Sequence, residues 1–152
     1  MDWQQDEFTI STDKTKLSVD YIHEYLSQQS YWAAGIPFDT VKRAVEGSLC
    51  FGIYHGERQI GFARLVTDQA TFAYLADVFI DKAYRGRGLS KWLMEMIMQY
   101  PGLQGLRRMM LATRDAHELY RKYGFTGIEH PERLMQIVFD NIYTRAGNEG
   151  QA

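Results

Sequence analysis

Two arginines and two glycines alternate from Arg85 to Gly88, between a nearly all-apolar run and a run with helical spacing. The start of a helix presents unpaired backbone N–H groups and the positive end of the helix dipole, which together favour an anion. The glycines leave room for a phosphate to approach, while Arg85 and Arg87 add positive charge and hydrogen-bond donors. The pattern predicts a pyrophosphate-binding turn, and the alternative is an ordinary strand-to-helix connection with solvated arginines.

Two better-known phosphate-binding patterns are missing around this turn. No Gly-Lys-Ser or Gly-Lys-Thr follows the glycines, and the spacing G-x-G-x-x-G does not occur there. The first pattern is typical of ATP- and GTP-binding P-loops and the second of dinucleotide-binding folds. The turn therefore does not indicate ATP or NAD as the ligand.

The composition predicts one compact domain. With 152 residues, of which 45% are hydrophobic and 14% aromatic, a single core can bury roughly 68 to 70% of the unfolded surface. We expect this domain to span residues 1–143 and residues 144–152 to form a disordered tail. The formal net charge of -2 argues against a general nucleic-acid surface, and a single cysteine excludes an internal disulfide framework.

The N-terminus and the hydropathy of the chain indicate no export and no membrane anchor. The sequence MDWQQDEFTIS is acidic and lacks the basic start and apolar stretch of a signal peptide. No apolar run approaches the ~20 residues that a membrane span needs. We expect a soluble, cytoplasmic protein.

Hydrophobic periodicity predicts a mixed α/β or α+β domain. Strands are expected at residues 8–11, 49–54, 59–67, 71–80, 107–113 and 135–143. Helices are expected after Ser18, over residues 39–46 with Asp39 as the cap, over 88–100 and around 116–123. Residues 71–80 have lost strict alternation, and Thr71 and Asp77 are their clearly polar members, which is typical of a strand covered on both faces.

The arginine-glycine turn and its surroundings resemble a known family. RGRGLS is similar to the acyl-CoA signature Q/R-x-x-G-x-G/A of the GNAT superfamily of N-acetyltransferases, with Arg85 first, Gly88 fourth and Ser90 sixth. DVFIDKAY resembles the family's fourth strand, and ATRDAHELYRKYGF resembles its later motif. Together these stretches cover about residues 49–125 in the family's order. Ser90 replaces the preferred glycine or alanine, and Thr113 replaces an asparagine found in many members.

The resemblance implies a GNAT-like fold, a mixed and mostly antiparallel central sheet flanked by helices on both faces, with acetyl-CoA as cosubstrate and no metal. In that fold the acyl-CoA arm pairs with the backbone of the strand before the turn. The implied strand residues are Val78, Phe79 and Ile80. The implied pyrophosphate cradle comprises the N–H groups of Arg85, Gly86, Arg87, Gly88, Leu89 and Ser90. Thr113 either contacts the pantetheine arm or caps the following helix.

Two residues are candidates for proton transfer. Tyr120 occupies the place of the family's catalytic tyrosine, and a phenol can protonate a departing thiolate; the alternative is that Tyr120 simply packs on its helix face. Asp77 is the charge inside a buried strand and is the candidate general base, or equally a hydrogen-bonded structural residue. Glu24, His23 and His117 are weaker candidates for the base.

The acceptor site implied by the family lies in the segment SQQSYWAAGIPF and nearby strand ends. Tyr31, Trp32 and Phe38 either form an aromatic wall for an amine or anchor an irregular loop in the core.

Three further residues have side chains that could react or bind a metal. We interpret Cys50 as a small buried residue rather than a nucleophile. His55 and His130 lack the spacing of metal ligands.

The sequence therefore predicts an acetyl-CoA-dependent N-acetyltransferase acting on a small-molecule amine, with no nucleic-acid or membrane partner. A protein N-terminal or lysine acetyltransferase and a non-catalytic acyl-CoA-binding sensor are the alternatives. An RNA-binding module using RGRG is disfavoured by the acidic balance. The family also suggests a homodimer.

Overall fold

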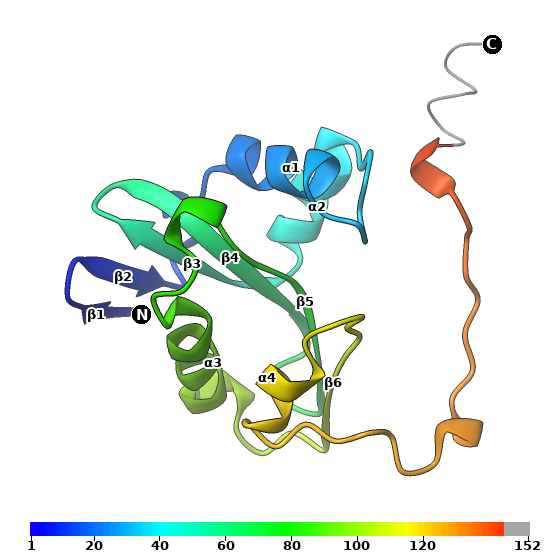
Figure 1. Ribbon diagram of the computed structural model, residues 1–152. Helices are drawn as coiled ribbons and strands as arrows, with labels where there is room; N and C mark the ends of the chain where they lie inside the picture. Colours follow the sequence, from blue (N-terminus) through cyan, green and yellow to red (C-terminus); the bar gives the residue numbers. More distant parts are fainter. Residues whose placement is uncertain (145–152) are drawn as a thin grey trace.

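The computed structural model describes residues 1–144 and contains a six-stranded sheet with helices on both faces (Figure 1). The strands are β1 (Asp2–Gln5), β2 (Phe8–Ser11), β3 (Leu49–His55), β4 (Arg58–Thr67), β5 (Phe72–Ile80) and β6 (Arg108–Leu111). The helices are α1 (Val19–Gln28), α2 (Phe38–Glu46), α3 (Leu89–Gln99) and α4 (His117–Arg121). Short 3-10 turns lie at Lys14–Lys16, Lys82–Tyr84, Pro101–Leu103 and Pro131–Arg133.

The strands follow one another across the sheet in chain order, and the pairing of β5 with β6 is the one parallel pairing among the described strands. Helices α1 and α2 cover one face, and α3 and α4 cover the other (Figure 1). The predicted mixed, mostly antiparallel sheet is confirmed. Within residues 1–144 the helices are too short or too polar to cross a membrane.

Two hydrophobic cores lie on opposite faces of this sheet. The core under α3 contains Phe51, Leu65, Trp92, Leu93 and Ile97. The core under α1 and α2 contains Ile22, Leu26, Val41, Cys50 and Phe62. Consecutive strand residues such as Cys50 and Phe51 point to opposite faces. Because both faces are covered, the central strands are apolar at almost every position.

The first two helices begin differently. Ser18 caps α1 as predicted, and its Oγ accepts a hydrogen bond from the Tyr21 N–H at 3.2 Å. The predicted cap at Asp39 is wrong, because α2 begins at Phe38 after Pro37 and has no side-chain cap bond. Asp39 instead lies in the first turn of α2, where its negative charge interacts favourably with the positive end of the helix dipole.

The strand predicted at residues 135–143 is wrong. Residues 134–139 have no regular secondary structure, and Met135 and Phe139 are 98% and 68% exposed. The stretch has the apolar, β-branched composition of a strand, but a strand also needs a neighbour for its backbone, and no strand of residues 1–144 pairs with it. The predicted tail begins at Thr144, and its residues 145–152 lie outside the described part of the chain.

The N-terminal strand β1 was missed for the opposite reason. Its residues are mostly polar and exposed, so the sequence there shows no alternation of apolar and polar residues that would predict a strand. It forms because each of its residues pairs with β2. An ion pair of 2.7 Å between Lys16 Nζ and Asp2 Oδ2 ties the hairpin to the following turn.

Candidate active site

A β-bulge in β5 interrupts its pairing with β4. Two residues of β5, Asp77 and Val78, lie opposite the single residue Ala63 of β4. Asp77 takes a φ of 54°, the left-handed region that side chains other than glycine rarely adopt. A conformation of this kind persists where its surroundings impose it, and it concentrates at functional sites.

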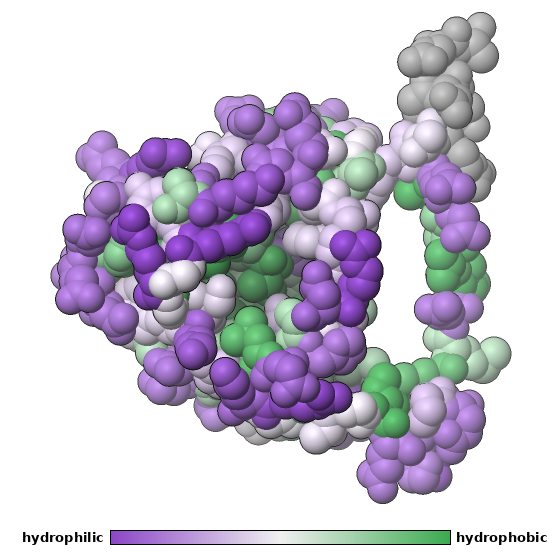
Figure 2. All heavy atoms as spheres, viewed as in Figure 1, coloured by the Kyte–Doolittle hydropathy of each residue, from purple (hydrophilic) through white to green (hydrophobic). Residues whose placement is uncertain are grey.

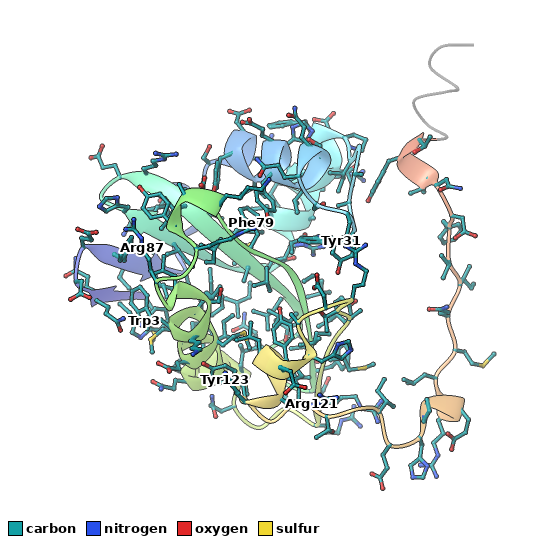
Figure 3. All side chains as sticks on the ribbon, viewed as in Figure 1. Trp3, Tyr31, Phe79, Arg87, Arg121 and Tyr123 are labelled. Atoms are coloured by element: carbon teal, nitrogen blue, oxygen red, sulfur yellow. The ribbon has the colours of Figure 1, made fainter. Side chains whose placement is uncertain are left out.

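The bulge exchanges the two faces of β5. Before it, Leu75 packs into the core under α3, and after it Ile80 does so, five residues later. Phe79 packs into the core under α1 and α2, where its ring stacks on Tyr25 at 3.8 Å (Figure 3). An unbroken strand would place Phe79 on the same face as Leu75. The bulge thus directs Asp77 and Phe79 toward the α1 and α2 side.

Beyond Leu75, strands β5 and β6 separate. Their parallel pairing runs from Phe72 to Leu75, and the last pair joins Leu75 to Leu111. Residues 76–80 of β5 therefore have no strand beside them on that edge within the described chain. Such an edge offers unpaired N–H and C=O groups. Val78, Phe79 and Ile80, predicted for the acyl-CoA arm, all lie along it, and Figure 2 shows apolar residues in the hollow of this face.

The glycine turn lies at the start of α3. Gly86 and Gly88 have φ values of 81° and 77°, and a Cβ at either position would meet nothing within 4 Å. The Gly88 carbonyl accepts the first helical bond from the Trp92 N–H at 3.1 Å. A hollow of about 320 Å³ is lined by this turn, Ser90, Lys91 and Leu119. Open space over a helix start is a place where an anion can bind.

The two arginines of the turn have different surroundings. Arg85 points inward, where its Nη2 donates to the Tyr25 hydroxyl at 2.9 Å and its Nε to the Ile80 carbonyl at 3.2 Å. Arg87 is half exposed and lies over the Tyr84 ring at 5.2 Å (Figure 3). Arg85 therefore fixes the turn to α1 and β5. Arg87 makes a long ion pair in solvent, with 4.0 Å between its Nη1 and Glu7 Oε1.

Tyr120 lies in α4 and borders a cavity at the point where β6 leaves β5. Its ring is 9% exposed, and the cavity of about 220 Å³ is also lined by Leu111, Thr113 and His117. Burial raises the pKa of the Tyr120 hydroxyl above its usual value, so the group stays protonated at neutral pH. Among the described residues this hydroxyl has no hydrogen-bond partner. The Thr113 hydroxyl accepts from the Ala116 N–H at 3.0 Å and so caps the turn before α4.

Asp77 lies in a network on the other face of the sheet. Its Oδ2 accepts from Arg64 Nε at 2.5 Å, and its Oδ1 accepts from Trp32 Nε1 at 2.8 Å. The ion pair is largely buried, with side chains 20% exposed for Arg64 and 10% for Asp77. Arg64 also donates to the Ser48 hydroxyl at 3.2 Å. Asp77 is thus a paired, hydrogen-bonded carboxylate beside an exposed indole.

The predicted aromatic residues divide into two groups. Tyr31 and Trp32 meet edge to face at 5.1 Å, and the Arg114 guanidinium lies 3.8 Å from the centre of the Tyr31 ring (Figure 3). Through Trp32, this pair adjoins Asp77. Phe38 is separate, because its ring contacts His23 at the start of α2. The structure brings together Tyr31, Trp32 and Asp77, and it places Phe38 in another contact.

The remaining candidates have structural surroundings or lie in solvent. Cys50 is buried, and burial raises the pKa of its thiol to about 11, so it is not a reactive thiolate. His23 Nε2 lies 3.0 Å from the Ile36 carbonyl, and Glu24 is exposed. His117 is exposed beside the Tyr120 cavity.

No metal-binding cluster forms in the described residues. Residues 1–144 contain no group of three or more histidine, cysteine, aspartate and glutamate side chains placed to hold an ion. His55 instead contacts the Tyr84 hydroxyl at 2.9 Å, and His130 contacts Glu132 at 3.2 Å.

Two residues of the site were not foreseen from the sequence. Arg64 is a charge in the mostly apolar middle of β4, as Asp77 is in β5, and two such charges on neighbouring strands indicate a buried pair. Lys91 lines the hollow at the glycine turn, three residues after Gly88. A lysine in the first turn of a helix that follows a glycine turn is the sequence signal that could have identified Lys91.

Comparison with known proteins decides the family. The profile of the Acetyltransferase (GNAT) family matches residues 3–125. The chain belongs to the GNAT acetyltransferase family. Members of this GNAT family transfer an acetyl group from acetyl-CoA to an acceptor. FG08082 of Gibberella zeae, named as an acetyltransferase, is 34% identical over 142 residues, which covers 79% of each chain.

Solved structures agree with this assignment. A GNAT-family protein of Xanthomonas campestris is 50% identical, with a TM-score of 0.88 over 90% of this chain and 96% of that chain. A GNAT acetyltransferase of Elizabethkingia anophelis, solved with acetyl-CoA bound, shares the fold at 13% identity, with a TM-score of 0.61 over 90% of this chain and 91% of that chain. The GNAT-like fold predicted from the sequence is therefore confirmed.

Proposed function

We propose that this GNAT protein is an N-acetyltransferase that transfers the acetyl group of acetyl-CoA to a primary amine of a small molecule by direct attack on the thioester. We call the gap that opens between β5 and β6 after the Leu75–Leu111 pair the fork. The observation that carries the proposal is this fork, with the Tyr120 cavity at the point where the strands separate. The fork gives an extended acyl-CoA arm a strand edge to pair with, and it opens beside a buried, protonated phenol.

The chain would hold acetyl-CoA at two places. The backbone of Val78, Phe79 and Ile80 would pair with the pantetheine arm, and the N–H groups from Arg85 to Ser90 would cradle the pyrophosphate. Arg87 and Lys91 would add charge at the cradle. Acetyl-CoA supplies an activated acetyl group, to which the amine nitrogen forms a C–N bond as the C–S bond breaks.

Two protons must move during this reaction, and each has a candidate group. The Tyr120 hydroxyl would donate its proton to the departing thiolate. An alkylamine with a pKa near ~10.4 is mostly ammonium at neutral pH and must lose a proton before it attacks. Asp77 would accept that proton, directly or through a water. Both of its oxygens already accept one hydrogen bond each, and each keeps a further lone pair.

The acceptor would bind on the α1 and α2 side of the fork, against Tyr31 and Trp32. These two rings are 48% and 42% exposed and adjoin a carboxylate, which suits a cationic amine. Phe38 would take part only at the rim, because its ring is held against His23. A protein N-terminus or lysine as acceptor, and a sensor that binds acyl-CoA without turnover, are the alternatives.

Thermal stabilisation and thiol release separate these functions. Acetyl-CoA should raise the melting temperature of the protein, and a panel of small primary amines should release free CoA thiol in its presence. The buried Cys50 thiol should not disturb a colorimetric thiol assay. Stabilisation without thiol release for any amine or peptide would favour the sensor. Release with peptides alone would favour the protein acetyltransferase, and no stabilisation would overturn the acetyl-CoA site.

A further inference from the structure

An arginine without an acidic partner lies beside the aromatic residues of the proposed acceptor site. Arg114 follows Thr113 in the loop between β6 and α4, and its side chain is exposed. Arg64, by contrast, is paired with Asp77. Within residues 1–144 no carboxylate lies within ion-pair distance of the Arg114 guanidinium. Its positive charge is therefore uncompensated at close range in the described part of the chain.

Two contacts with Tyr31 hold Arg114 in place. The guanidinium carbon lies 3.8 Å from the centre of the Tyr31 ring, and the Arg114 backbone N–H donates to the Tyr31 hydroxyl at 3.3 Å. A guanidinium that covers an aromatic ring keeps the N–H groups of its edge available for hydrogen bonds. Because these contacts already order the side chain, binding an anion costs little further conformational entropy. Arg114 is thus positioned as a binding group.

The Arg114 contact also changes what Tyr31 can bind. One face of the ring already carries a positive charge, and a second cation near it would be repelled by the guanidinium. An ammonium group is better placed at Trp32, whose ring is 42% exposed and whose Nε1 donates to Asp77 at 2.8 Å. The acceptor site therefore has a negative end at Asp77 and a positive end at Arg114.

The positive end adjoins the proposed reaction centre. Thr113, the residue before Arg114, lines the Tyr120 cavity. Burial raises the pKa of the Tyr120 hydroxyl, and the nearby Tyr31 hydroxyl and Asp115 carboxylate raise it further. Tyr31 therefore lies close to the candidate acid as well as to Arg114. An amine that reacts at the fork would have a second charged group directed toward this loop.

On the basis of the proposed function, acetyl transfer to a primary amine, we propose that the acceptor also carries an anionic group, a carboxylate or a phosphate, and that Arg114 binds this group. The ammonium end lies against Trp32 and Asp77 before it loses its proton. The anionic end accepts hydrogen bonds from the edge of the guanidinium, whose paired N–H groups match two oxygens of a carboxylate or a phosphate. Arg114 then determines specificity and takes no part in proton transfer.

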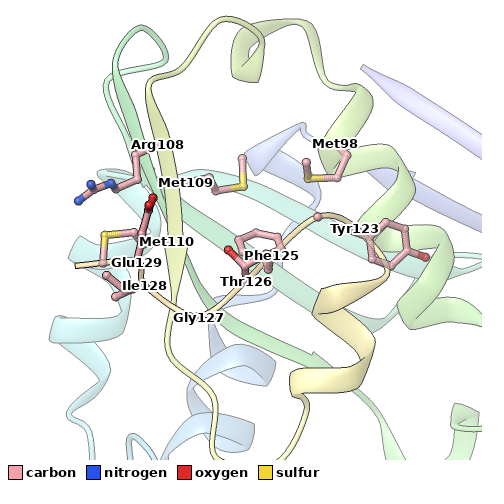
Figure 4. A pocket seen from close by; sticks show the side chains of 11 residues that line it. Met98, Arg108, Met109, Met110, Tyr123, Phe125, Thr126, Gly127, Ile128 and Glu129 are labelled. Carbon is pink, nitrogen blue, oxygen red and sulfur yellow. The ribbon is translucent and has the colours of Figure 1, made fainter. Parts of the chain in front are cut away.

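A second exposed arginine lies at the other end of β6. Arg108 lines a pocket of about 340 Å³ (Figure 4), whose other residues come from β6, the end of α3 and 123–129. Arg108 pairs with Phe72, at the end of β5 that is remote from Asp77. An anion bound in that pocket would not lie at the acceptor rings. Arg108 is therefore a matched control for Arg114.

Matched pairs of acceptors test the anionic group. Thiol release from acetyl-CoA is measured with a series of ω-amino acids of increasing length, each beside its own amide, and with phosphoethanolamine beside ethanolamine. The acidic member should have a kcat/KM roughly 10- to 100-fold higher, because it alone makes a charge-assisted hydrogen bond to arginine. A preference within the amino acid pairs identifies a carboxylate, and a preference for phosphoethanolamine identifies a phosphate.

The same measurement separates this inference from the proposed function. If the neutral amines were used as well as their acidic counterparts, the anionic group would be wrong and N-acetyl transfer would stand. No thiol release with either member of any pair would overturn both.

Variants of Arg114 test the residue itself. Arg114→Gln should raise KM for the preferred acidic amine roughly 10- to 100-fold, and kcat should change little, because the guanidinium touches no reacting atom. Arg114→Lys keeps the charge but loses the planar pair of donors, and its KM should be intermediate. Arg108→Gln should keep the preference of the wild type. Thermal stabilisation by acetyl-CoA reports that each variant is folded and binds the cofactor.

Two results would remove Arg114 from the acceptor site. One is a preference for the acidic amine that survives Arg114→Gln. The other is an equal loss of activity toward acidic and neutral amines in that variant, which would mean that Arg114 only holds the loop in place.

Discussion

At the scale of single residues, the surroundings of Tyr120 and Asp77 favour different protonation states and hydrogen bonding. Tyr120 is buried against apolar neighbours with a hydroxyl that no described residue engages. Asp77 is also shielded from solvent, but each of its oxygens accepts one hydrogen bond, from a guanidinium and from an indole. The first arrangement keeps a proton on oxygen, and the second holds an acceptor in a fixed orientation. They lie on opposite faces of the sheet, Tyr120 with the core under α3 and Asp77 beside the core under α1 and α2.

Tyr120→Phe should lower turnover by roughly 10²- to 10⁴-fold, the usual contribution of a general acid. The affinity for acetyl-CoA should be unchanged, because the hydroxyl makes no hydrogen bond to residues 76–80 of β5 or to the glycine turn. Steady-state kinetics and calorimetric titration measure the two quantities. Tyr123→Phe is the matched control, since its hydroxyl donates to the Lys91 carbonyl at 3.0 Å away from the cavity. Equal turnover in all three proteins would remove Tyr120 from the mechanism.

Asp77→Asn should lower turnover and abolish the acidic limb of the pH–rate profile, because the amide cannot accept a proton at neutral pH. The substitution also leaves Arg64 unpaired, which costs about 3–5 kcal/mol of stability for a buried pair. Arg64→Gln breaks the same pair but keeps the carboxylate. It should destabilise the protein similarly, lower turnover less and retain an acidic limb. If the two variants had the same pH–rate profile, the base would have to be another residue or a water relay.

At the scale of elements, the site depends on two backbone features, the bulge of β5 and the left-handed glycines before α3. The sequence indicated the second strongly, because glycine spacing at a helix start is a local signal. The bulge was not foreseen, since an extra residue in one strand becomes visible only when the register with β4 is known. The fork between β5 and β6 depends on that register as well. The acyl-CoA arm was therefore assigned to residues 78–80 by family resemblance and not by local pattern.

Gly88→Ala should weaken acetyl-CoA binding by roughly tenfold or more, because a methyl group in the open cradle displaces a charge-assisted hydrogen bond worth about 1.5–3 kcal/mol. It should also cost about 1–2 kcal/mol of stability, since alanine resists a left-handed conformation. Gly105→Ala is the matched control, because Gly105 also has a φ of 77° and open space around its Cβ position. Titration calorimetry should show weaker binding in the first variant alone. Equal affinities would mean that the turn does not hold the pyrophosphate.

The mistaken strand at 135–143 has a different physical cause. Local composition reports how well a segment would fit a pleated, half-buried surface, and residues 135–139 fit it well. It cannot report whether a neighbouring strand is supplied. Within residues 1–144 no strand pairs with this segment, and the prediction failed for that reason. The opposite error occurred at β1, where a strand forms that the sequence did not predict. Its polar residues carry no strand pattern, but each of them pairs with β2.

At the scale of the whole molecule, buried tyrosines set how stability depends on alkaline pH. Burial raises the pKa of Tyr21, Tyr54 and Tyr120 in the folded protein. The unfolded chain ionises near pH ~10, so above this pH the folded state binds more protons than the unfolded state. The contribution of these tyrosines to the free energy of unfolding should therefore be constant below about pH 10 and should fall as the pH rises further.

Tyr54→Phe should reduce that alkaline fall. The Tyr54 hydroxyl is buried without a hydrogen-bond partner in the described chain, so its removal should leave stability at neutral pH unchanged or raise it by about 1 kcal/mol. Denaturant unfolding at pH 7 and at pH 11 measures both effects, and the pH 7 value of the same variant is the control. A fall as steep as that of the wild type would show that Tyr54 ionises normally in the folded state.

The extra residue in β5 could be removed without moving either core. Deleting Asp77 would bring Val78 opposite Ala63 and leave Phe79 opposite Phe62 and Ile80 opposite Gly61, so the side chains after the bulge would keep their faces. The same deletion would straighten β5 and take away the carboxylate that pairs with Arg64. A chain shortened by this one residue would keep both cores and lose only the bend and its carboxylate.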